Sequence, residues 1–394
     1  MSFDAEQTYD AVYAWSEAEG FAGHDPFDGL ESRVFQVTPL RYVALARLAW
    51  LQMVKRSSSD LRSVLQVPKG VNSKGIALFA LAELSNFRRT NSDLHKQDTR
   101  RHLDTLQGLA IKGRTQAGET TTAFGYNFDW QSRAFFAPKG TPTIVPTAFA
   151  ARAFLESYRL FGEGADLEIV IEIGRFIAND LNRPHEGGDT VCFSYTPSDR
   201  SLIFNASLLA GETLAVAGAI LNDAGYLELA AKSARYVIGN QNENGSWAYG
   251  PKLRHGWVDN FHTAFILLSL RRIGAEVPDL NTNDAIKRGF EFWLENMFLP
   301  DGTPKYYDSE TYPIDIHSAA AAIAVLAEFS DLDPRALPLT EKVAGWTIEN
   351  MRDPEGYFYY QLRRGETVKT PFIRWGQAWM AYALAKLLEA RAGE

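Results

Sequence analysis

A repeat of about 55 residues constrains the fold of this chain more than any other feature of its sequence. Three segments share one order: the end of a helix, an asparagine, a polar turn with glycine, and then aromatic residues. These segments are 235–250, 291–308 and 345–361. Their turn glycines Gly245, Gly302 and Gly356 are separated by 57 and 54 residues. A period of this length is typical of proteins that stack helix pairs.

Two kinds of helix alternate along the chain. Helices rich in alanine, leucine and glycine are predicted at 73–84, 147–160, 206–220, 262–273, 317–329 and 376–390. Longer amphipathic helices, with charges between apolar residues at helical spacing, are predicted near 40–55, 94–111, 165–181, 225–240, 282–297 and 338–351. One further helix is expected near 4–18.

This alternation predicts an all-α fold, an (α/α)6 toroid of six inner and six outer helices with an extra N-terminal helix. Small residues suit the crowded inner ring, and amphipathic helices suit the outer ring. An open solenoid of helix pairs would give a similar pattern. Closure is preferred because six repeats fill a ring. No linker rich in Pro, Gly or Ser divides the sequence, so residues 1–394 are expected to form a single toroid domain.

Composition narrows the class of protein. The formal net charge of −8 argues against attraction of the whole protein to nucleic acid or to an anionic membrane, and leaves room for a local basic patch. The longest apolar stretch, 43–54, contains Arg47 and is too short to span a bilayer. The single cysteine, Cys192, excludes an intrachain disulfide. The N-terminus lacks the pattern of a secretory signal, so a cytoplasmic protein is expected.

Four segments of the sequence resemble a known family. They read NGSWAYG, WVDNFHTAFILLSL, YPIDIHSAA and KTPFIRWGQAWMAYALAKLL. They are similar to bacterial (α/α)6-toroid proteins of exopolysaccharide and capsule loci, and the resemblance covers most of residues 20–392. More distantly, the toroid resembles unsaturated uronyl hydrolases, uronate lyases and glucuronyl C5-epimerases. The resemblance implies a carbohydrate-active enzyme of exopolysaccharide metabolism, with an oligosaccharide or polysaccharide and other polysaccharide-assembly proteins as partners.

A second resemblance is weaker. The fragment QNENGSW is similar to the QW repeat of squalene cyclases and prenyltransferase-type folds. The chain has neither the DxDD motif that protonates an isoprenoid nor the DDxxD motif that binds a metal–diphosphate cluster. No phosphate-binding or dinucleotide motif is present either. No cofactor is therefore expected.

The loops that enter the inner helices of a toroid surround one mouth, and they carry the candidate catalytic residues. His262 and His317 are 55 residues apart, which is one repeat, and each follows an aspartate, Asp259 or Asp315. A histidine exchanges protons near neutral pH, and a carboxylate can orient it. Tyr306 could protonate a leaving oxygen. This set would suit β-elimination or C5 epimerisation of a uronic acid.

Three alternatives for these junctions stay open. Two carboxylates could run glycoside hydrolysis, chosen from Asp129, Asp199, Asp259, Asp308 and Asp315. Asp259, Asn260 and Asp315 also lie where helices start and could serve only as helix caps. A two-histidine metal site would need Asp259 or Asp315, but the chain lacks a compact motif such as HExxH, and no metal is predicted.

Aromatic and basic residues near the same junctions are candidates for substrate binding. Flat rings could stack on sugars, or could pack the helix-to-loop junctions, as expected above all for Trp247. Arginines could bind a carboxylate bidentately, and Asn260 and Arg374 could neutralise a uronate. The candidates are Trp130, Trp247, Tyr249, Tyr307, Tyr360, Asn260, Arg133, Arg200 and Arg374.

The leading hypothesis is therefore an enzyme for an acidic, uronate-containing glycan, acting as a lyase, epimerase or hydrolase. A non-catalytic glycan-binding or assembly protein would keep the aromatic and basic residues without needing both histidines. An isoprenoid-binding, cyclase-like protein would instead have a dry pocket without basic groups.

Overall fold

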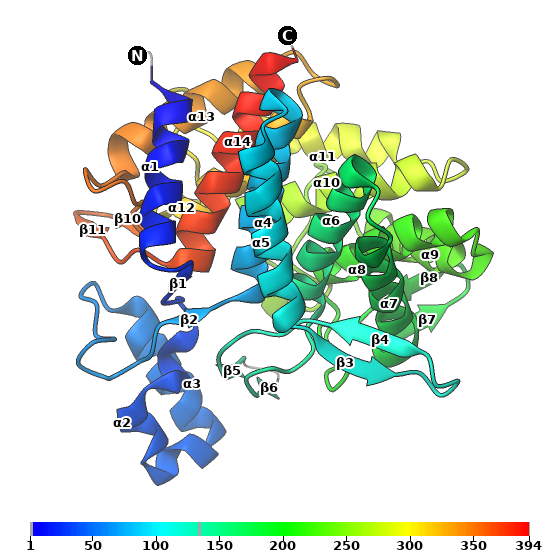
Figure 1. The fold of residues 1–394 in the computed structure, drawn as a ribbon, viewed down its shortest axis with the longest axis horizontal. Coiled ribbons are helices and arrows are strands. Elements are labelled where there is room, and N and C mark those ends of the chain that lie inside the picture. Colours follow the sequence, from blue (N-terminus) through cyan, green and yellow to red (C-terminus); the bar gives the residue numbers. More distant parts are fainter. Residues whose placement is uncertain (1–2, 133–134, 394) are drawn as a thin grey trace.

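The computed structural model describes residues 3–132 and 135–393, and within these ranges it is built from two concentric rings of helices (Figure 1). Each helix of the inner ring contacts the next, and the last contacts the first, so the ring is closed. The inner helices are α4 (Ser73–Thr90), α6 (Ile144–Phe161), α8 (Phe204–Leu221), α10 (Asn260–Glu276), α12 (Ile316–Glu328) and α14 (Ala378–Ala392). The predicted toroid is confirmed.

The outer ring alternates with the inner one. Its helices are α1 (Ala5–Ala18), α5 (Asp93–Gly108), α7 (Gly164–Asp180), α9 (Ala224–Ile238), α11 (Asn283–Asn296) and α13 (Ala336–Met351). The repeated glycine turns lock each hairpin onto the next outer helix. Gly245, Gly302 and Gly356 have φ of +89°, +96° and +105°, and a Cβ at each would meet backbone of α11, α13 and α1 respectively.

The two N-terminal helices exchange their expected places. The helix predicted near 4–18 was expected to be extra, but α1 fills the outer slot after α13 and contacts α14. The helix predicted near 40–55 was expected in the outer ring. It is α3 (Ala44–Arg56), which contacts the short helical turns beside it and β5, and lies outside both rings (Figure 1). Both helices are amphipathic, so periodicity could not reveal which partner each one packs against.

The other elements are short. The helical turns are η1 (Asp28–Glu31), α2 (Arg33–Gln36), η2 (Pro39–Tyr42), η3 (Leu253–His255) and η4 (Ile373–Gln377, a π-helical turn). The antiparallel pairs are β1 (Ala22–Gly23) with β2 (Gly70–Val71), β3 (Ile111–Arg114) with β4 (Thr120–Ala123), β5 (Trp130–Gln131) with β6 (Phe136–Ala137), and β7 (His185–Gly187) with β8 (Thr190–Cys192). The three-stranded sheet joins β9 (Ile314–Asp315), β10 (Gln361–Arg363) and β11 (Glu366–Val368). As predicted, the sheet content of the described residues is limited to such short pairings.

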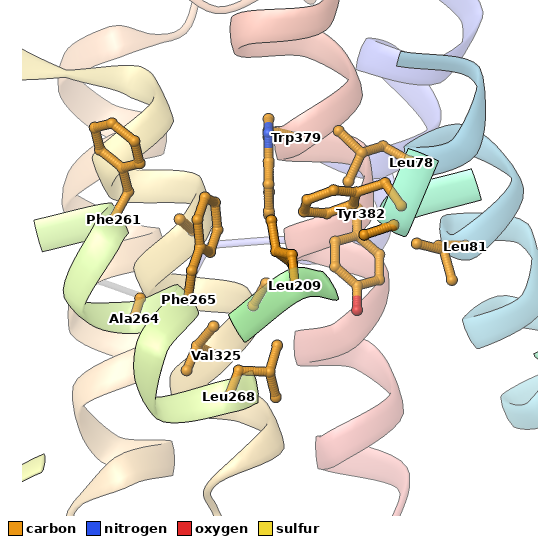
Figure 2. Packing of buried hydrophobic residues seen from close by; sticks show 14 of the residues in the cluster. Leu78, Leu81, Leu209, Phe261, Ala264, Phe265, Leu268, Val325, Trp379 and Tyr382 are labelled. Atoms are coloured by element: carbon orange, nitrogen blue, oxygen red, sulfur yellow. The ribbon is translucent and has the colours of Figure 1, made fainter. Parts of the chain in front are cut away.

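Large apolar side chains fill the axis of the inner ring. Figure 2 shows Phe265 of α10 facing Trp379 of α14, with Leu209 of α8 beside them. The two rings stack with their centroids 5.4 Å apart. Helix α8 is long and apolar enough to cross a bilayer, but 83% of it is buried in this core. The axis is therefore a packed core over part of its length.

A series of ion pairs links the inner helices on the other side of this apolar core, away from their amino ends. Glu212 of α8 accepts hydrogen bonds from Arg152 of α6 at 2.5 and 2.7 Å and from Arg272 of α10 at 3.0 Å. Arg272 also pairs with Glu328 of α12 at 3.0 Å, and Glu328 accepts from Tyr382 of α14 at 2.9 Å. Neighbouring inner helices are thus joined by polar contacts as well as by apolar packing.

Arg88 of α4 closes this chain of charges. It pairs with Glu156 of α6 and, at 3.6 Å, with Glu389 of α14. Every neighbouring pair of inner helices is therefore linked by at least one polar side-chain contact.

Loop length sets where a site can form. The first five inner helices each lead into an outer helix through a short loop, such as residues 91–92 between α4 and α5. The return connections are long, for example 239–259 and 352–377. The amino ends of all the inner helices and these long loops therefore gather at one end of the toroid.

Replacing Glu212 should destabilise the protein strongly, because it would leave Arg152 buried without its carboxylate. We expect Glu212→Gln to lower the free energy of unfolding at neutral pH by about 3 kcal/mol. The exposed pair of Glu291 with Arg335 provides the control, and Glu291→Gln should cost less than about 1 kcal/mol. Urea denaturation measures both values.

The same variant should show a specific pH dependence. Burial alone would raise the pKa of Glu212, but Arg152 and Arg272 lower it to about 2. A lowered pKa means that the ionised carboxylate stabilises the folded state above about pH 4.5, and that this stabilisation is lost as the pH falls toward 2. The difference between the unsubstituted protein and Glu212→Gln should shrink over that range. A difference that does not change with pH would contradict this role.

Candidate functional site

A cavity of about 610 Å³ opens at the end of the toroid where the inner helices begin. The start of every inner helix contributes to its wall, through Lys74, Val145, Asn205, His262, His317 and Trp375 just before α14. Long loops add aromatic side chains such as Tyr126, Trp130 and Tyr195, and the N-terminal segment adds Phe27, Gln52 and Lys55. This is the mouth that the sequence predicts.

His262 forms a dyad with Asp259 at this mouth. Asp259 caps α10, where its Oδ1 accepts the backbone N–H of His262 at 2.9 Å. Its Oδ2 lies 2.7 Å from Nδ1 of the same histidine and also accepts the Trp257 indole N–H at 3.1 Å. The carboxylate holds the ring with Nδ1 occupied, which leaves Nε2 for a ligand. Asp259 is therefore both a helix cap and the orienting group predicted for His262.

His317 is held differently. Its Nδ1 lies 3.1 Å from the carbonyl oxygen of Trp375, and since a carbonyl only accepts, Nδ1 carries the proton and Nε2 has the lone pair. Its ring stacks on the Trp375 indole with centroids 4.1 Å apart. Burial, followed by the charges of Lys74 and Arg374, lowers the pKa of His317 well below its usual range. His317 is therefore a neutral imidazole that offers an acceptor.

Three tyrosines surround the histidines. The Tyr249 ring lies 4.7 Å from both the His262 ring and the Trp257 ring. Tyr306 and Tyr307 also line the cavity. Burial, and then the charge of Asp259, raises the pKa of all three hydroxyls. The tyrosines therefore stay protonated and can donate hydrogen bonds or a proton.

Lys74 is a buried amine without an acidic partner in the part of the chain that the structure describes. Its side chain is only 2% exposed, and its Nζ lies 4.4 Å from the centre of the Phe149 ring and 5.1 Å from that of Trp379. Burial, followed by the charges of Arg374 and Arg152, lowers its pKa well below the usual value for lysine. A buried amine of this kind gains most from an acceptor that a ligand brings.

Arg374 is already neutralised. Its guanidinium donates to both carboxylate oxygens of Asp25, at 2.6 and 2.8 Å, and both side chains are buried. Asp25 and Asp28 also hold the N-terminal segment, since Arg62 donates to the carboxylate of Asp28 and to the backbone carbonyl of Asp25. Arg374 lines the cavity, but its first role is to fasten this segment to the mouth.

The cavity wall contains other polar groups that could bond to a ligand. Lys55 of α3 lies 4.0 Å above the Phe27 ring, and burial lowers its pKa to about 8. Asn205 Oδ1 and His255 Nδ1 are buried without a hydrogen-bond partner among the described residues, and both residues line the cavity. The wall therefore presents cations, an amide oxygen and a ring nitrogen to whatever binds there.

Asp315 lies outside the cavity and does not orient His317. It caps α12 through the backbone N–H of His317 at 2.9 Å. Its other contacts are the Trp375 indole N–H at 2.9 Å and the Gln361 amide at 2.6 Å. Burial raises its pKa to about 6. Asp315 therefore positions Trp375, and through this ring it supports His317 indirectly.

Asn260 is likewise structural. Its amide donates to the backbone carbonyls of Met297 and Lys305, and its oxygen accepts the Trp293 indole N–H at 2.8 Å. It is fully buried and does not line the cavity. The expectation that it contacts a uronate is not supported, because all these bonds fix the loop before α10.

Other candidates for substrate binding also lie elsewhere. Trp247 is buried, donates to the Val237 carbonyl at 2.9 Å and packs against Gly289 of α11, as expected for a residue that joins two repeats. Tyr360 lines a separate small pocket, and Arg200 is exposed outside the cavity wall. Arg133 lies outside the described residues. Trp130, Tyr249, Tyr307 and Arg374 do line the cavity.

The described residues contain no group of three histidine, cysteine, aspartate or glutamate side chains placed to hold a metal ion. Cys192 is buried, and burial raises the pKa of its thiol to about 12, which disfavours the reactive thiolate.

The fold is shared with several carbohydrate-active enzymes. Cellobiose 2-epimerase from Bacillus thermoamylovorans superposes with a TM-score of 0.61 at 12% identity, over 82% of this chain and 88% of that one. Unsaturated glucuronyl hydrolase from Bacillus sp. GL1 also gives 0.61, at 10% identity over 96% and 94%. The α-mannanase of Bacteroides thetaiotaomicron gives 0.61 at 13% identity over 93% and 99%.

The sequence matches no protein-family model and no curated protein. Identities of 10 to 13% establish a common fold. The predicted distant similarity to uronyl hydrolases and epimerases is confirmed at this level. The reaction has to be argued from the cavity itself.

Removing the partner of Arg374 should loosen the N-terminal segment. We expect Asp25→Asn to lower the free energy of unfolding by about 3 kcal/mol, because a buried guanidinium loses its carboxylate. Limited proteolysis should then cut within 28–65 more rapidly. Asp60→Asn is the control, since Asp60 lies 3.6 Å from Arg62 and is 40% exposed. Equal proteolysis of the two variants would show that the Asp25–Arg374 pair does not fasten this segment.

Proposed function

We propose that this protein is a carbohydrate-active enzyme that removes the proton next to the carboxylate of a uronate residue in an acidic glycan. Loss of that proton leads to β-elimination, or to C5 epimerisation if a proton returns on the other face. The observation that carries the proposal is that the His262–Asp259 dyad, a neutral His317 and the unpaired Lys74 line one cavity. A lyase or an epimerase needs these types of group together.

His262 is the proposed base. Its Nε2 is free, and the Asp259 carboxylate on the opposite nitrogen stabilises the imidazolium that forms when the proton arrives. Proton transfer by a positioned group of this kind contributes about 10²- to 10⁴-fold to the rate.

Lys74 is the proposed receptor for the uronate carboxylate. Proton removal from the neighbouring carbon places further negative charge on that carboxylate, and a cation beside it in a poorly solvated site stabilises the charge. Arg374 is less suited to this task because Asp25 already occupies both arms of its guanidinium.

Tyr249, Tyr306 or Tyr307 would supply the proton that a leaving oxygen needs, because their hydroxyls stay protonated. The lone pair of His317 would accept a sugar hydroxyl. The aromatic wall, which includes Trp130 and Trp257, suits the flat faces of sugar rings.

The cavity gives less support to glycoside hydrolysis, which uses two carboxylates. Among the five aspartates considered from the sequence, only Asp259 lines the cavity in the described structure. Asp199 bonds to Thr196 and Ser201 within its own loop. Asp129 accepts the backbone N–H of Lys139.

The basic lining also argues against an isoprenoid ligand, because Lys55, Lys74 and Arg254 would face a hydrocarbon. A role in exopolysaccharide metabolism, with assembly proteins as partners, and a cytoplasmic location stay predictions from the sequence.

Loss of the base should abolish turnover without unfolding the protein. We expect His262→Ala to lower turnover about 10²- to 10⁴-fold on a panel of uronate oligosaccharides, with an unchanged melting temperature. Deuterium entering C5 from heavy water, followed by NMR, reports epimerisation, because only that reaction returns a proton to C5. Ultraviolet absorbance of the unsaturated product reports elimination. His317→Ala should lower turnover less, because it loses only an acceptor.

His185→Ala is the control, since His185 bonds to Thr190 in the β7–β8 hairpin and does not line the cavity. Full activity of both stable cavity variants would refute histidine catalysis. Tight glycan binding by an unsubstituted protein that catalyses neither reaction would favour the non-catalytic hypothesis instead.

Lys74 should give the protein a higher affinity for acidic glycans than for neutral ones. We expect Lys74→Met to weaken binding of a uronate oligosaccharide about 10- to 100-fold, which is the usual value of a hydrogen-bonded charge, and to leave its carboxyl-reduced counterpart unaffected. Binding should also take up a proton, because the carboxylate restores the charge of an amine whose pKa burial has lowered.

Calorimetry in two buffers of different ionisation enthalpy measures that proton. Lys287→Met is the control, because Lys287 is exposed on outer helix α11 and does not line the cavity. Equal binding of the acidic and the reduced glycan by the unsubstituted protein would contradict the proposed role of Lys74.

A further inference from the structure

The short helical unit outside the toroid has an unusual surface. Among the described residues, fourteen large hydrophobic side chains are exposed, and seven of them lie between residues 34 and 53. We call these seven the apolar patch: Val34, Val37, Leu40, Tyr42, Val43, Leu45 and Met53. Their exposed fractions reach 85% for Val37 and 75% for Leu45. Apolar side chains concentrated in this way mark a surface that binds something.

The patch is not needed to fold the unit. A separate small core of Leu30, Phe35 and Leu51 already holds it together, with Trp50 stacked on Phe35 at 4.9 Å. The elements α2, η2 and α3 contact one another and project from the toroid (Figure 1). The apolar patch therefore faces away from the interior that its own unit buries.

All the charged residues of the same stretch are basic. Residues 33–56 contain five basic residues and no acidic residue, in a chain whose net charge is −8. The basic residues are Arg33, Arg41, Arg47, Lys55 and Arg56. None of them forms an ion pair among the described residues, unlike Arg62, Arg101 and Arg335. Their counter-charges must come from solution or from a partner.

We propose that the apolar patch docks this protein on an anionic lipid bilayer. Exposed Leu, Val, Met and Tyr side chains enter the boundary between headgroups and acyl chains, while the exposed Arg33, Arg41 and Arg56 meet the negative headgroups. Neither contribution suffices on its own for a stable attachment, and this stretch supplies both. The net charge of the whole chain does not prevent docking, because its surface potential is screened within about 10 Å.

A second copy of this chain would be a poorer occupant. In a twofold dimer the same patch meets itself, which brings the three exposed arginines Arg33, Arg41 and Arg56 against three more. A bilayer supplies the opposite charge. Helix α3 also contributes Gln52 and Lys55 to the cavity wall, so a docked molecule would hold its cavity mouth close to the bilayer.

Vesicle flotation with the full chain tests the proposal. The probes are vesicles of phosphatidylcholine alone, and vesicles in which about one third of the lipid is phosphatidylglycerol. We expect binding to the second kind only, and binding that weakens as salt rises. The triple variant Leu40→Ser, Val43→Ser, Leu45→Ser should bind at least about 10-fold more weakly.

A matched control separates the patch from hydrophobicity in general. Leu94, Leu221 and Leu332 are exposed leucines outside the patch, and replacing all three with serine should leave vesicle binding unchanged. A charge variant, Arg33→Gln, Arg41→Gln, Arg56→Gln, should lose the preference for phosphatidylglycerol. Circular dichroism confirms that each variant is folded.

Three outcomes would overturn the proposal. They are no binding of the unsubstituted protein to either kind of vesicle, equal binding of the patch variant and the leucine control, and a dimer in light scattering that the patch variant converts to a monomer. The last would assign the patch to self-association. The test is independent of the proposed reaction, because none of these variants changes a residue of the cavity.

Discussion

The ion pairs that join neighbouring inner helices are the constraint on which the rest of the structure depends. Arg152 and Arg272 both reach Glu212, and Arg88 bridges the first inner helix to the last. A buried charge without a partner costs stability, so these side chains favour one arrangement of neighbouring helices over others. A closed ring in turn places the amino ends of all inner helices around one opening. The cavity is a consequence of that closure, because no single hairpin contains enough of its wall.

The two ends of the axis differ in whether their basic side chains have acidic partners. At the end with the ion pairs, Arg152 and Arg272 meet carboxylates at 2.5 to 3.0 Å. At the cavity end, Lys74 is as deeply buried but meets aromatic rings. The stacked Phe265 and Trp379 separate the two ends (Figure 2). Closure of the ring thus supplies the stability that lets a lysine remain without a partner, and in the proposed function this lysine is the group that selects an anionic ligand.

Much of this could be predicted from the sequence, since the 55-residue period, the small inner helices and the pair His262–Asp259 all depend on local spacing. The rest depends on contacts between distant residues. Asp259 and Asp315 occupy equivalent capping positions, yet only Asp259 also bonds to a histidine side chain, and no local pattern distinguishes them. Asp25 lies 349 residues from Arg374 along the chain, so no local pattern could pair the two. Lys55 reaches the cavity only because α3 leaves the ring, where periodicity had placed it.

A crystal structure of the His262→Ala variant with a bound uronate oligosaccharide tests the central claim most directly, because that variant should retain the substrate unreacted. The account predicts a uronate in the cavity, with its carboxylate about 3 Å from Lys74 Nζ and its C5 facing the space left by the imidazole. A glycan bound outside the cavity would contradict the account. A sugar hydroxyl beside Lys74, with the carboxylate in solvent, would contradict it equally.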